Sequence, residues 1–260
     1  CYGVFLGFNE LEPLKSLQPK FNSIDNFKIV FNDPRFYTIL SDTTFFVLGS
    51  VVASFLLGLA TALLLNEKVK GRSVFRSIML IPWVTPVVVT GIIWRFLLDP
   101  NIGVVNFELS RLGVIKEYVA WLIKPLAWYT IVGINCWRLF PFCYLALLAG
   151  LSSIREDLYE AAKMDGAGTL DRFRYVTLPG IRGTARVVFI LNLIWQWDNF
   201  SLIWNLTYGG PGYDTTVLPI YIYMMAFQFY HFGPAAAMGI IAFLIILSLT
   251  IFYMKRISVD

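Results

Sequence analysis

Long uncharged stretches alternate with polar connectors along this chain. A helix crosses a bilayer with about 20 apolar residues, and five stretches reach that length: 43–65, 77–98, 125–151, 187–206 and 234–254. A buried helix of a soluble protein can also be apolar all round. Five such stretches in one chain, flanked by Trp and Tyr, indicate instead that the helices span a membrane.

Three other segments need separate interpretations. Residues 1–8 are too few to cross a bilayer, and we interpret them as the tail of a span whose start is missing. Residues 9–40 are mixed in character and contain three prolines, which predicts an exposed loop with short local structure. Residues 218–229 are apolar but short, so we predict a re-entrant or interfacial segment there.

Composition supports the same class of protein. Hydrophobic residues make up 57% of the 260 and charged residues only 15%, which leaves too little polar surface to cover a soluble globule. The predicted fold is all-α, a polytopic transmembrane helical bundle with a six-helix core whose first helix is clipped. We expect residues 1–40 to form the end of the first span and an extracytoplasmic loop, and residues 41–260 to form the transmembrane domain.

Basic residues predict the orientation of the bundle. Twelve of them lie in connectors 66–76 and 152–186 and in the C-terminal tail, against eight spread over the longer opposite loops. Cytoplasmic loops carry the excess of Lys and Arg. These connectors and the C-terminus are therefore predicted to be cytoplasmic in a multi-pass cell-membrane (inner-membrane) protein. The net charge of +4 follows from this topology and requires no nucleic-acid partner.

Few residues are suited to catalysis or metal binding. The cysteines form no CxxC, and Cys136 and Cys143 lie in an apolar span, which is typical of packing residues. His231, the only histidine, has no Cys, Asp or Glu at ligand spacing. Residues 209–212, Gly-Gly-Pro-Gly, match neither phosphate-binding glycine pattern and are interpreted as a turn. We predict no catalytic residues and no metal site.

The longest patterned polar stretch is 160–179, which reads EAAKMDGAGTLDRFRYVTLP. Just before it, Ser153 and Glu156 have the spacing of a capping box, in which the two side chains satisfy backbone donors at the start of a helix. That helix is predicted to run to about Met164. Local physics alone leaves open the interpretation of the stretch as a solvated connector between two spans.

A turn and a second short helix are expected after Met164. Residues 165–168, Asp-Gly-Ala-Gly, can turn at positive φ, Thr169 can cap the helix, and the Leu-Pro pair at 178–179 can end it. The loop as a whole resembles the EAA motif of ABC-importer permeases, which combines EAA with Asp-Gly-Ala, an aromatic residue and Leu-Pro. The matching residues are Glu160, Ala161, Ala162, Asp165, Gly166, Ala167, Phe173, Leu178 and Pro179.

Two charged residues fall inside predicted spans. Arg138 and Asp198 lie at membrane depth, where a charge costs about 2.5–3.5 kcal/mol on insertion scales. They either pair with each other or line a water-filled cavity. The run 195–199, Trp-Gln-Trp-Asp-Asn, favours a cavity, because aromatic faces and amides suit the ring and the hydroxyls of a sugar. A polar seam between helices explains the same residues, and both interpretations stay open.

Nearly the whole chain resembles the sugar-importer permeases of the maltose-transporter type. It shares the Gly-Gly-Pro loop at 209–211 and a Tyr-Ile-Tyr run at 221–223. In that family a Phe-Asn-Phe-Asn-Asn-Phe stretch, here 195–200, and a Leu-Gly-Tyr-Pro-Tyr stretch, here 138–142, contact the sugar. The resemblance implies substrate contacts from Arg138, Leu139, Phe142, Asn192, Trp195, Gln196 and Asn199. Arg138 and Gln196 depart from the family's residues, and a guanidinium would suit an acidic or phosphorylated glycan.

The resemblance also implies a type I ABC-importer permease fold and a function. The chain would form half of the pathway of an ATP-driven, binding-protein-dependent importer of a di- or oligosaccharide. Its EAA loop, 152–183, would couple to the ATPase through Glu160, Ala161, Ala162, Asp165, Gly166, Leu178 and Pro179. The implied partners are a second permease subunit, a homodimeric ATP-binding subunit that holds ATP and Mg²⁺, and an extracytoplasmic solute-binding protein, besides the carbohydrate and membrane lipid.

Two rival interpretations were weighed against the importer. The chain carries no nucleotide-binding motif and is expected to hold no cofactor, so a gradient-driven secondary transporter with Asp198 and Arg138 as an ion relay is the main alternative. The EAA-like loop and the lack of a repeated half argue against it. An intramembrane enzyme would need paired catalytic groups, and Asp198 has no acidic or histidine neighbour.

Overall fold

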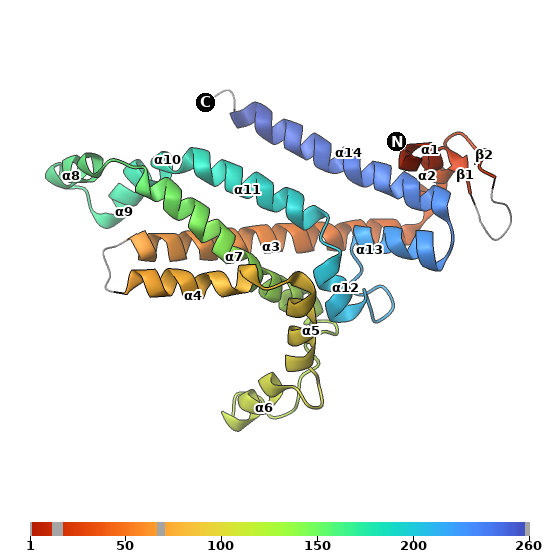
Figure 1. Cartoon of the computed structure of the whole chain (residues 1–260), viewed down its shortest axis with the longest axis horizontal. Helices are drawn as coiled ribbons and strands as arrows, with labels where there is room; N and C mark the ends of the chain where they lie inside the picture. Colours follow the sequence, from red (N-terminus) through yellow and green to blue (C-terminus); the bar gives the residue numbers. More distant parts are fainter. Residues whose placement is uncertain (1, 12–17, 67–70, 258–260) are drawn as a thin grey trace. The chain divides into compact units, whose positions relative to one another are not determined.

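The computed structural model describes residues 2–11, 18–66 and 71–257, which are mostly helical (Figure 1). Cys1 and two basic residues of the first connector, Lys68 and Lys70, lie outside the described residues. The α-helices are α1 Tyr2–Gly7, α2 Asp25–Asn32, α3 Pro34–Asn66, α4 Arg72–Val84, α5 Val87–Leu97, α6 Val104–Arg111, α7 Ala127–Ser152, α8 Glu156–Met164, α9 Thr169–Arg172, α10 Leu178–Gly180, α11 Arg182–Trp197, α12 Ser201–Thr207, α13 Leu218–Tyr223 and α14 Phe232–Ile257.

Short irregular elements complete the chain. Strands β1 (Asn9–Glu10) and β2 (Lys20–Phe21) pair antiparallel, with Asn9 opposite Phe21. Two π-helical segments, η1 (Phe173–Thr177) and η2 (Met224–Gln228), join α9 to α10 and extend α13. The segment predicted at 218–229 is therefore helical, and α13 with η2 is shorter than the spans.

Three of the five predicted spans are single helices. In the part of the chain that the structure describes, α3, α7 and α14 are each long and apolar enough to cross a membrane, which confirms the spans predicted at 43–65, 125–151 and 234–254. The loop predicted over residues 9–40 contains short local structure, as expected, in β1, β2 and α2, but it ends earlier than predicted because α3 already begins at Pro34. Proline has no N–H and is well suited to the first position of a helix.

The other two predicted spans are interrupted. The span predicted at 77–98 consists of two apolar helices, because α4 and α5 are bent by 91° at Thr85-Pro86. Pro86 has no N–H and restricts the preceding residue, and Thr85 accordingly has an extended ψ of 126°. The span predicted at 187–206 is likewise interrupted, because α11 ends at Trp197 and α12 begins only at Ser201.

Several hydroxyl side chains of α3 donate to carbonyl groups of the same helix. Thr43 Oγ1 donates to the carbonyl of Ile39 at 2.6 Å, and Ser54 Oγ donates to Ser50 O at 2.6 Å. Thr61 repeats this four-residue pattern. A hydroxyl in the hydrocarbon region has no water to bond, so these internal bonds keep α3 compatible with a membrane.

Residue contacts divide the chain into two compact units. Unit 2 comprises Leu48–Thr90 and Val132–Trp195. Its core consists of buried side chains mainly from α7: Ala62, Phe140, Tyr144, Leu147, Leu148, Leu151 and Ile181. The backbones of α3 and α7 approach closely at Gly58, where a Cβ would lie 2.4 Å from Cys143 Cβ. Small residues at helix crossings allow such approach in membranes.

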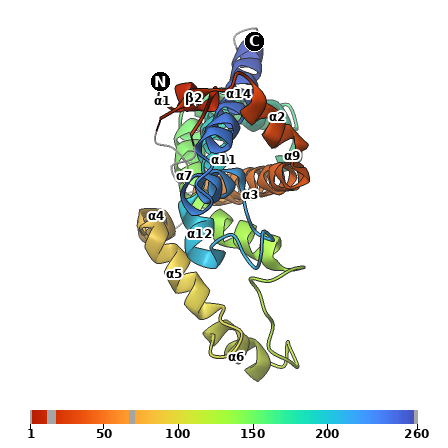
Figure 2. The same cartoon turned by 90° about the vertical axis from the view of Figure 1, so that its right-hand side faces the viewer.

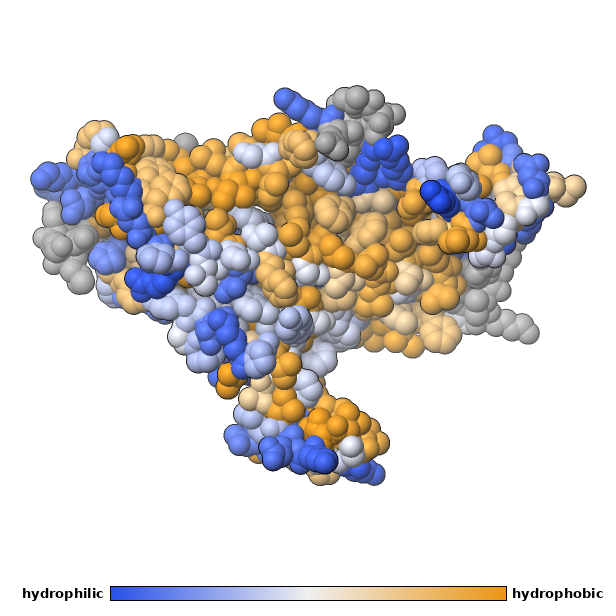
Figure 3. All heavy atoms as spheres, turned by 180° about the vertical axis from the view of Figure 1, so that it is seen from behind, coloured by the Kyte–Doolittle hydropathy of each residue, from blue (hydrophilic) through white to orange (hydrophobic). Residues whose placement is uncertain are grey.

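Unit 1 comprises Cys1–Val47, Gly91–Ile131 and Gln196–Asp260. In it α14 packs against α1, α2 and α13. The fully buried Thr43 accepts a hydrogen bond from the backbone N–H of Leu218 at its Oγ1, 2.8 Å away. Helix α6 follows at the far end of α5 (Figure 2). Apolar side chains cover large areas of the molecular surface, as expected for helices that face lipid (Figure 3).

The glycine-rich segment 209–212 is a turn, as predicted. Gly209 and Gly212 have φ of 84° and 58°, and Thr216 Oγ1 donates to the Gly209 carbonyl at 2.8 Å. The segment is tied to the loop before α7 by an ion pair of 2.9 Å between Asp214 Oδ1 and Lys124 Nζ. This hydrogen bond raises the pKa of Lys124.

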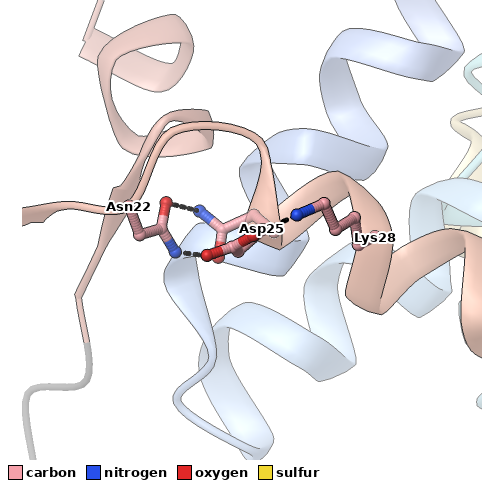
Figure 4. A network of polar contacts seen from close by, with 4 residues as sticks. Asn22, Asp25 and Lys28 are labelled. Atoms are coloured by element: carbon pink, nitrogen blue, oxygen red, sulfur yellow. Dashed lines mark hydrogen bonds and ion pairs between the residues drawn. The ribbon is translucent and has the colours of Figure 1, made fainter.

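A buried asparagine joins α2 to the N-terminal residues of unit 1. Figure 4 shows the polar network of which it is part, with Asn22, Asp25 and Lys28 labelled. Asn26 is buried, and its Nδ2 lies 3.0 Å from Gly7 O and 2.9 Å from Asn9 O. It thus satisfies carbonyl groups that follow the end of α1.

We predict that Asn26→Leu, which keeps the side-chain volume, loosens α2. The orphaned carbonyls of Gly7 and Asn9 would cost about 1–3 kcal/mol. Tryptic cleavage after Lys28 in the purified protein should then be faster by about tenfold or more. Asp25→Asn is the control, because it removes only the exposed ion pair with Lys28. Equal cleavage rates in Asn26→Leu and the unmodified protein would contradict the prediction.

Candidate functional site

The polar loop between α7 and α11 begins with α8, Glu156–Met164, which ends at the predicted residue. The predicted capping box is wrong. Arg155 occupies the N-cap position without a side-chain bond, and Ser153 Oγ instead donates to Gly150 O at 2.8 Å. Because α7 continues to Ser152, Ser153 follows it directly and its hydroxyl bonds to the last turn of that helix.

The turn after α8 lies at Gly166, as predicted. Gly166 has φ of 80°, and its N–H donates to Lys163 O. Thr169 is the first residue of α9 and not its cap, because Gly168 takes the N-cap position and its N–H is bound by Asp171 Oδ2 at 3.1 Å. The Leu178-Pro179 pair lies inside α10, which ends one residue later at Gly180.

This loop, 152–183, is unusually exposed. No residue of α8 is buried, and its apolar side chains face outward, with Met164 88% and Leu170 of α9 77% exposed. Leu178 is also exposed. Glu160, Ala161 and Asp165 lie on the exposed surface, with Ala162 half-buried. Exposed apolar side chains rimmed by charges are typical of a protein interaction site.

The loop is held together by internal contacts and packs against the core of unit 2 at one residue. Tyr159 of α8 bonds to Thr177 of η1, with 3.0 Å between the two hydroxyl oxygens. A Cβ on Gly180 would lie 2.6 Å from Ile154 Cδ1, so the chain after α10 passes close to the end of α7. Ile154 in turn packs against the core of unit 2. The loop therefore contacts the core of unit 2 through Ile154.

Three aromatic rings of unit 2 form a cluster, which we call the aromatic cluster: Trp83, Phe142 and Trp195. The ring centroids of Phe142 and Trp195 are 4.7 Å apart, and those of Trp83 and Phe142 are 6.1 Å apart. Trp195 is 44% and Trp83 40% exposed. The rings come from α11, α7 and the last turn of α4. Their exposed faces can stack on the apolar face of a sugar ring.

Arg138 lies one helical turn before Phe142 on α7. Its Nε is buried and donates to no described residue of unit 2. A buried guanidinium N–H without an acceptor is costly, so the position is suited to an oxygen-rich ligand. Leu139, the next predicted contact, is 2% exposed and belongs to the packed interior.

Asn192 is fully buried, at 0% exposure. Its Nδ2 donates to Ser54 Oγ at 2.8 Å and lies 3.5 Å from Cys143 Sγ. These bonds join α11 to α3 and favour the interpretation of Asn192 as part of a polar seam between helices. The predicted contact of Asn192 with substrate stays a prediction. It requires that the bonds of Asn192 to Ser54 and Cys143 break.

Gln196 and Asn199 belong to unit 1 and bond to each other. Asn199 Nδ2 donates to Gln196 Oε1 at 2.8 Å, and Gln196 is 1% exposed. Asn199 lies in the break between α11 and α12, where Asp198 is exposed. Broken helices often line substrate sites in transporters, because freed backbone groups are tolerated only beside a cavity or protein.

Sequence reasoning missed Trp83. Trp83 lies in the apolar span predicted at 77–98. It stands two residues before Thr85-Pro86, where a proline signals a helix break. An aromatic side chain close to a proline within a span was the available signal. Its proximity to Phe142 depends on the packing of α4 against α7, which the sequence does not encode locally.

The sequence is similar to permease subunits of known transport systems. A family model described as the binding-protein-dependent transport system inner membrane component matches residues 54–255. The trehalose/maltose transport system permease protein MalF of Thermococcus litoralis is 42% identical over 202 residues, which cover 76% of this chain and 66% of that protein. The sulfoquinovosyl glycerol transport system permease protein SmoG of Agrobacterium fabrum is 32% identical over 255 residues, covering 98% and 82%.

The structure is also similar to solved structures of ABC-transporter chains. The crystal structure of a bacterial ABC transporter that imports the acidic polysaccharide alginate contains a chain with a TM-score of 0.83 and 26% identity, covering 98% of this chain and 87% of that chain. A second structure, of an alginate ABC transporter with its alginate pentasaccharide-bound periplasmic protein, also gives 0.83 at 26% identity, covering 97% and 85%. The chain belongs to the family of binding-protein-dependent transport system inner membrane components and has the fold of a type I ABC-importer permease.

Proposed function

We propose that this chain is one of two membrane-spanning subunits of an ATP-driven, binding-protein-dependent carbohydrate importer. The observation that carries the proposal is the exposed loop 152–183, a helix-turn-helix with no buried residue in its first helix. The named relatives transport trehalose or maltose and sulfoquinovosyl glycerol. ATP and Mg²⁺ would bind to a separate, homodimeric ATPase, and a solute-binding protein would deliver the sugar outside the cell.

The loop 152–183 would be the part of the chain that the ATPase contacts and moves. With the loop and the C-terminus in the cytoplasm, as the basic residues predict, α8 would dock into the ATPase through Glu160, Ala161, Ala162 and Asp165. Gly166 would set the direction of the next helix, and Leu178 and Pro179 would close the loop. Nucleotide-driven closure of the ATPase would then move unit 2 and switch access to the pathway from one side to the other.

The aromatic cluster would form one wall of the substrate site. Phe142 and Trp195 would stack on the sugar, with Trp83 beside them, and the Arg138 guanidinium would donate to sugar oxygens. A guanidinium donates hydrogen bonds to neutral hydroxyls as well as to carboxylates. Both neutral and acidic sugars are therefore candidate substrates. Leu139, Asn192, Gln196 and Asn199 remain proposed contacts on the basis of resemblance.

ATP hydrolysis by the intact transporter tests the proposal. The chain is purified with its associated subunits in nanodiscs, and hydrolysis is measured with a binding protein loaded from a panel of neutral and acidic oligosaccharides. We expect stimulation by one class of sugar. Absence of any associated ATPase, together with uptake that follows a proton or sodium gradient, would instead establish the secondary-transporter alternative.

A further inference from the structure

A cavity of 620 Å³ lies in unit 2 where α3 and α7 end, beside the loop 152–183, which we call the coupling loop after its proposed role. Its volume falls in the range of small-molecule sites. The side chains that bear on its chemistry are Leu63, Leu151, Tyr159, Arg172, Phe173 and Thr177. Nothing in the proposed transport cycle uses this cavity.

The polar side of the cavity is built around Arg172. Its Nε is buried and, in the described part of the chain, donates to no acceptor, while its Nη2 lies 3.3 Å from Thr169 Oγ1. The backbone around it is fixed, because Thr177 Oγ1 donates to Arg172 O and is itself bonded to the Tyr159 hydroxyl. A held guanidinium with a buried, unused N–H is suited to an anionic oxygen ligand.

The other side of the cavity is apolar. Leu63 lies one turn before the end of α3, Leu151 lies in the last turn of α7, and Phe173 begins η1. Because α3 and α7 are long enough to cross a membrane, their ends lie at the boundary between hydrocarbon and water. A ligand here meets a cation on the aqueous side and leucines on the hydrocarbon side, which is the division of polarity in a phospholipid.

We propose that this cavity binds an anionic phospholipid, with its phosphate on Arg172 and an acyl chain along Leu63 and Leu151. Basic pockets between transmembrane helices at the cytoplasmic surface are known to suit such headgroups. The inference goes beyond the proposed import function. A bound lipid would connect α8 and η1 to the ends of α3 and α7, so the coupling of ATP hydrolysis to the spans would depend on anionic lipid.

Photolabelling of the intact transporter tests this site. The complex is placed in nanodiscs of phosphatidylcholine that contain a photoactivatable phosphatidylglycerol, and labelled peptides are quantified. We expect saturable labelling of peptides from the ends of α3 and α7, reduced by about tenfold or more in Arg172→Gln. Arg174→Gln is the matched control, because Arg174 is exposed and stacks on Tyr175. It removes the same charge two residues further along the chain, in η1, whereas Arg172 is the last residue of α9.

Further measurements test the apolar half of the cavity and the identity of its occupant. If Arg172→Gln does not assemble, Leu63→Trp should reduce labelling by filling the apolar half of the cavity. Equal labelling of the unmodified protein, Leu63→Trp and any assembled Arg172 variant overturns the site. Displacement of the lipid by millimolar inorganic phosphate overturns the assignment to lipid, since the occupant would then be a soluble phosphate compound. Stimulated hydrolysis that increases with phosphatidylglycerol content only when Arg172 is intact supports it.

Discussion

A transporter with Gly166→Val is expected to lose most of its sugar-stimulated ATP hydrolysis while it still folds and assembles. Gly166 has φ of 80°, which a β-branched residue adopts only with strain. A Cβ at this position would meet no atom within 4 Å, so packing is not disturbed. The strain of about 1–3 kcal/mol would instead change the turn between α8 and α9, and coupling would fall by about 5–150-fold.

The measurement is the maximal rate of sugar-stimulated ATP hydrolysis by the purified complex. The amount of ATPase that co-purifies with the chain measures assembly. Gly168→Ala provides the control two residues later. Gly168 has φ of −67°, which alanine adopts freely, and it is exposed. A Gly166→Val complex that assembles and responds normally to sugar would show that the turn does not direct coupling.

Trp195→Ala should weaken transport of the sugar without reducing the amount of folded transporter. The change removes one of the two rings that stand 4.7 Å apart in the aromatic cluster. Loss of a stacking face and its apolar contact costs about 1–2 kcal/mol, or about 5–30-fold in affinity. Trp195 is 44% exposed, so its removal creates no closed cavity in the core.

The experiment compares the concentration dependence of uptake into vesicles for Trp195→Ala and Trp195→Phe. The phenylalanine variant keeps a flat ring and should retain most of the affinity. A double-mutant cycle with Phe142→Ala then measures how the two rings act together, and non-additive losses are expected for neighbours in one site. Unchanged uptake in Trp195→Ala would place the sugar elsewhere in the pathway.

Local sequence signals sufficed for much of this molecule. The end of α8 at Met164 and the turn at Gly166 follow from side-chain size and backbone freedom, and α3, α7 and α14 follow from hydrophobic length. These features depend on neighbours in the sequence, which is why they could be predicted. The capping box failed at Ser153 because α7 continued to the preceding residue, and no local rule fixes where a long apolar helix stops.

The proposed substrate site was less accessible to prediction. The resemblance named Phe142 and Trp195, but it did not distinguish residues with exposed rings from Asn192, whose amide is committed to Ser54. Trp83 was missed for a related reason, since its place beside Phe142 results from helix packing. Burial and hydrogen-bond partners are tertiary properties, which the local sequence does not encode.

The exposed side chains of the coupling loop also bear on how the cell must produce this chain. Leu158, Met164, Leu170 and Tyr175 present a contiguous segment with apolar groups open to water. A copy synthesised in excess of its ATPase would leave this segment uncovered, where proteases and chaperones recognise exposed apolar chain. If the loop docks to an ATPase as proposed, we expect the subunits to be made in balanced amounts, or unassembled copies of this chain to be degraded rapidly.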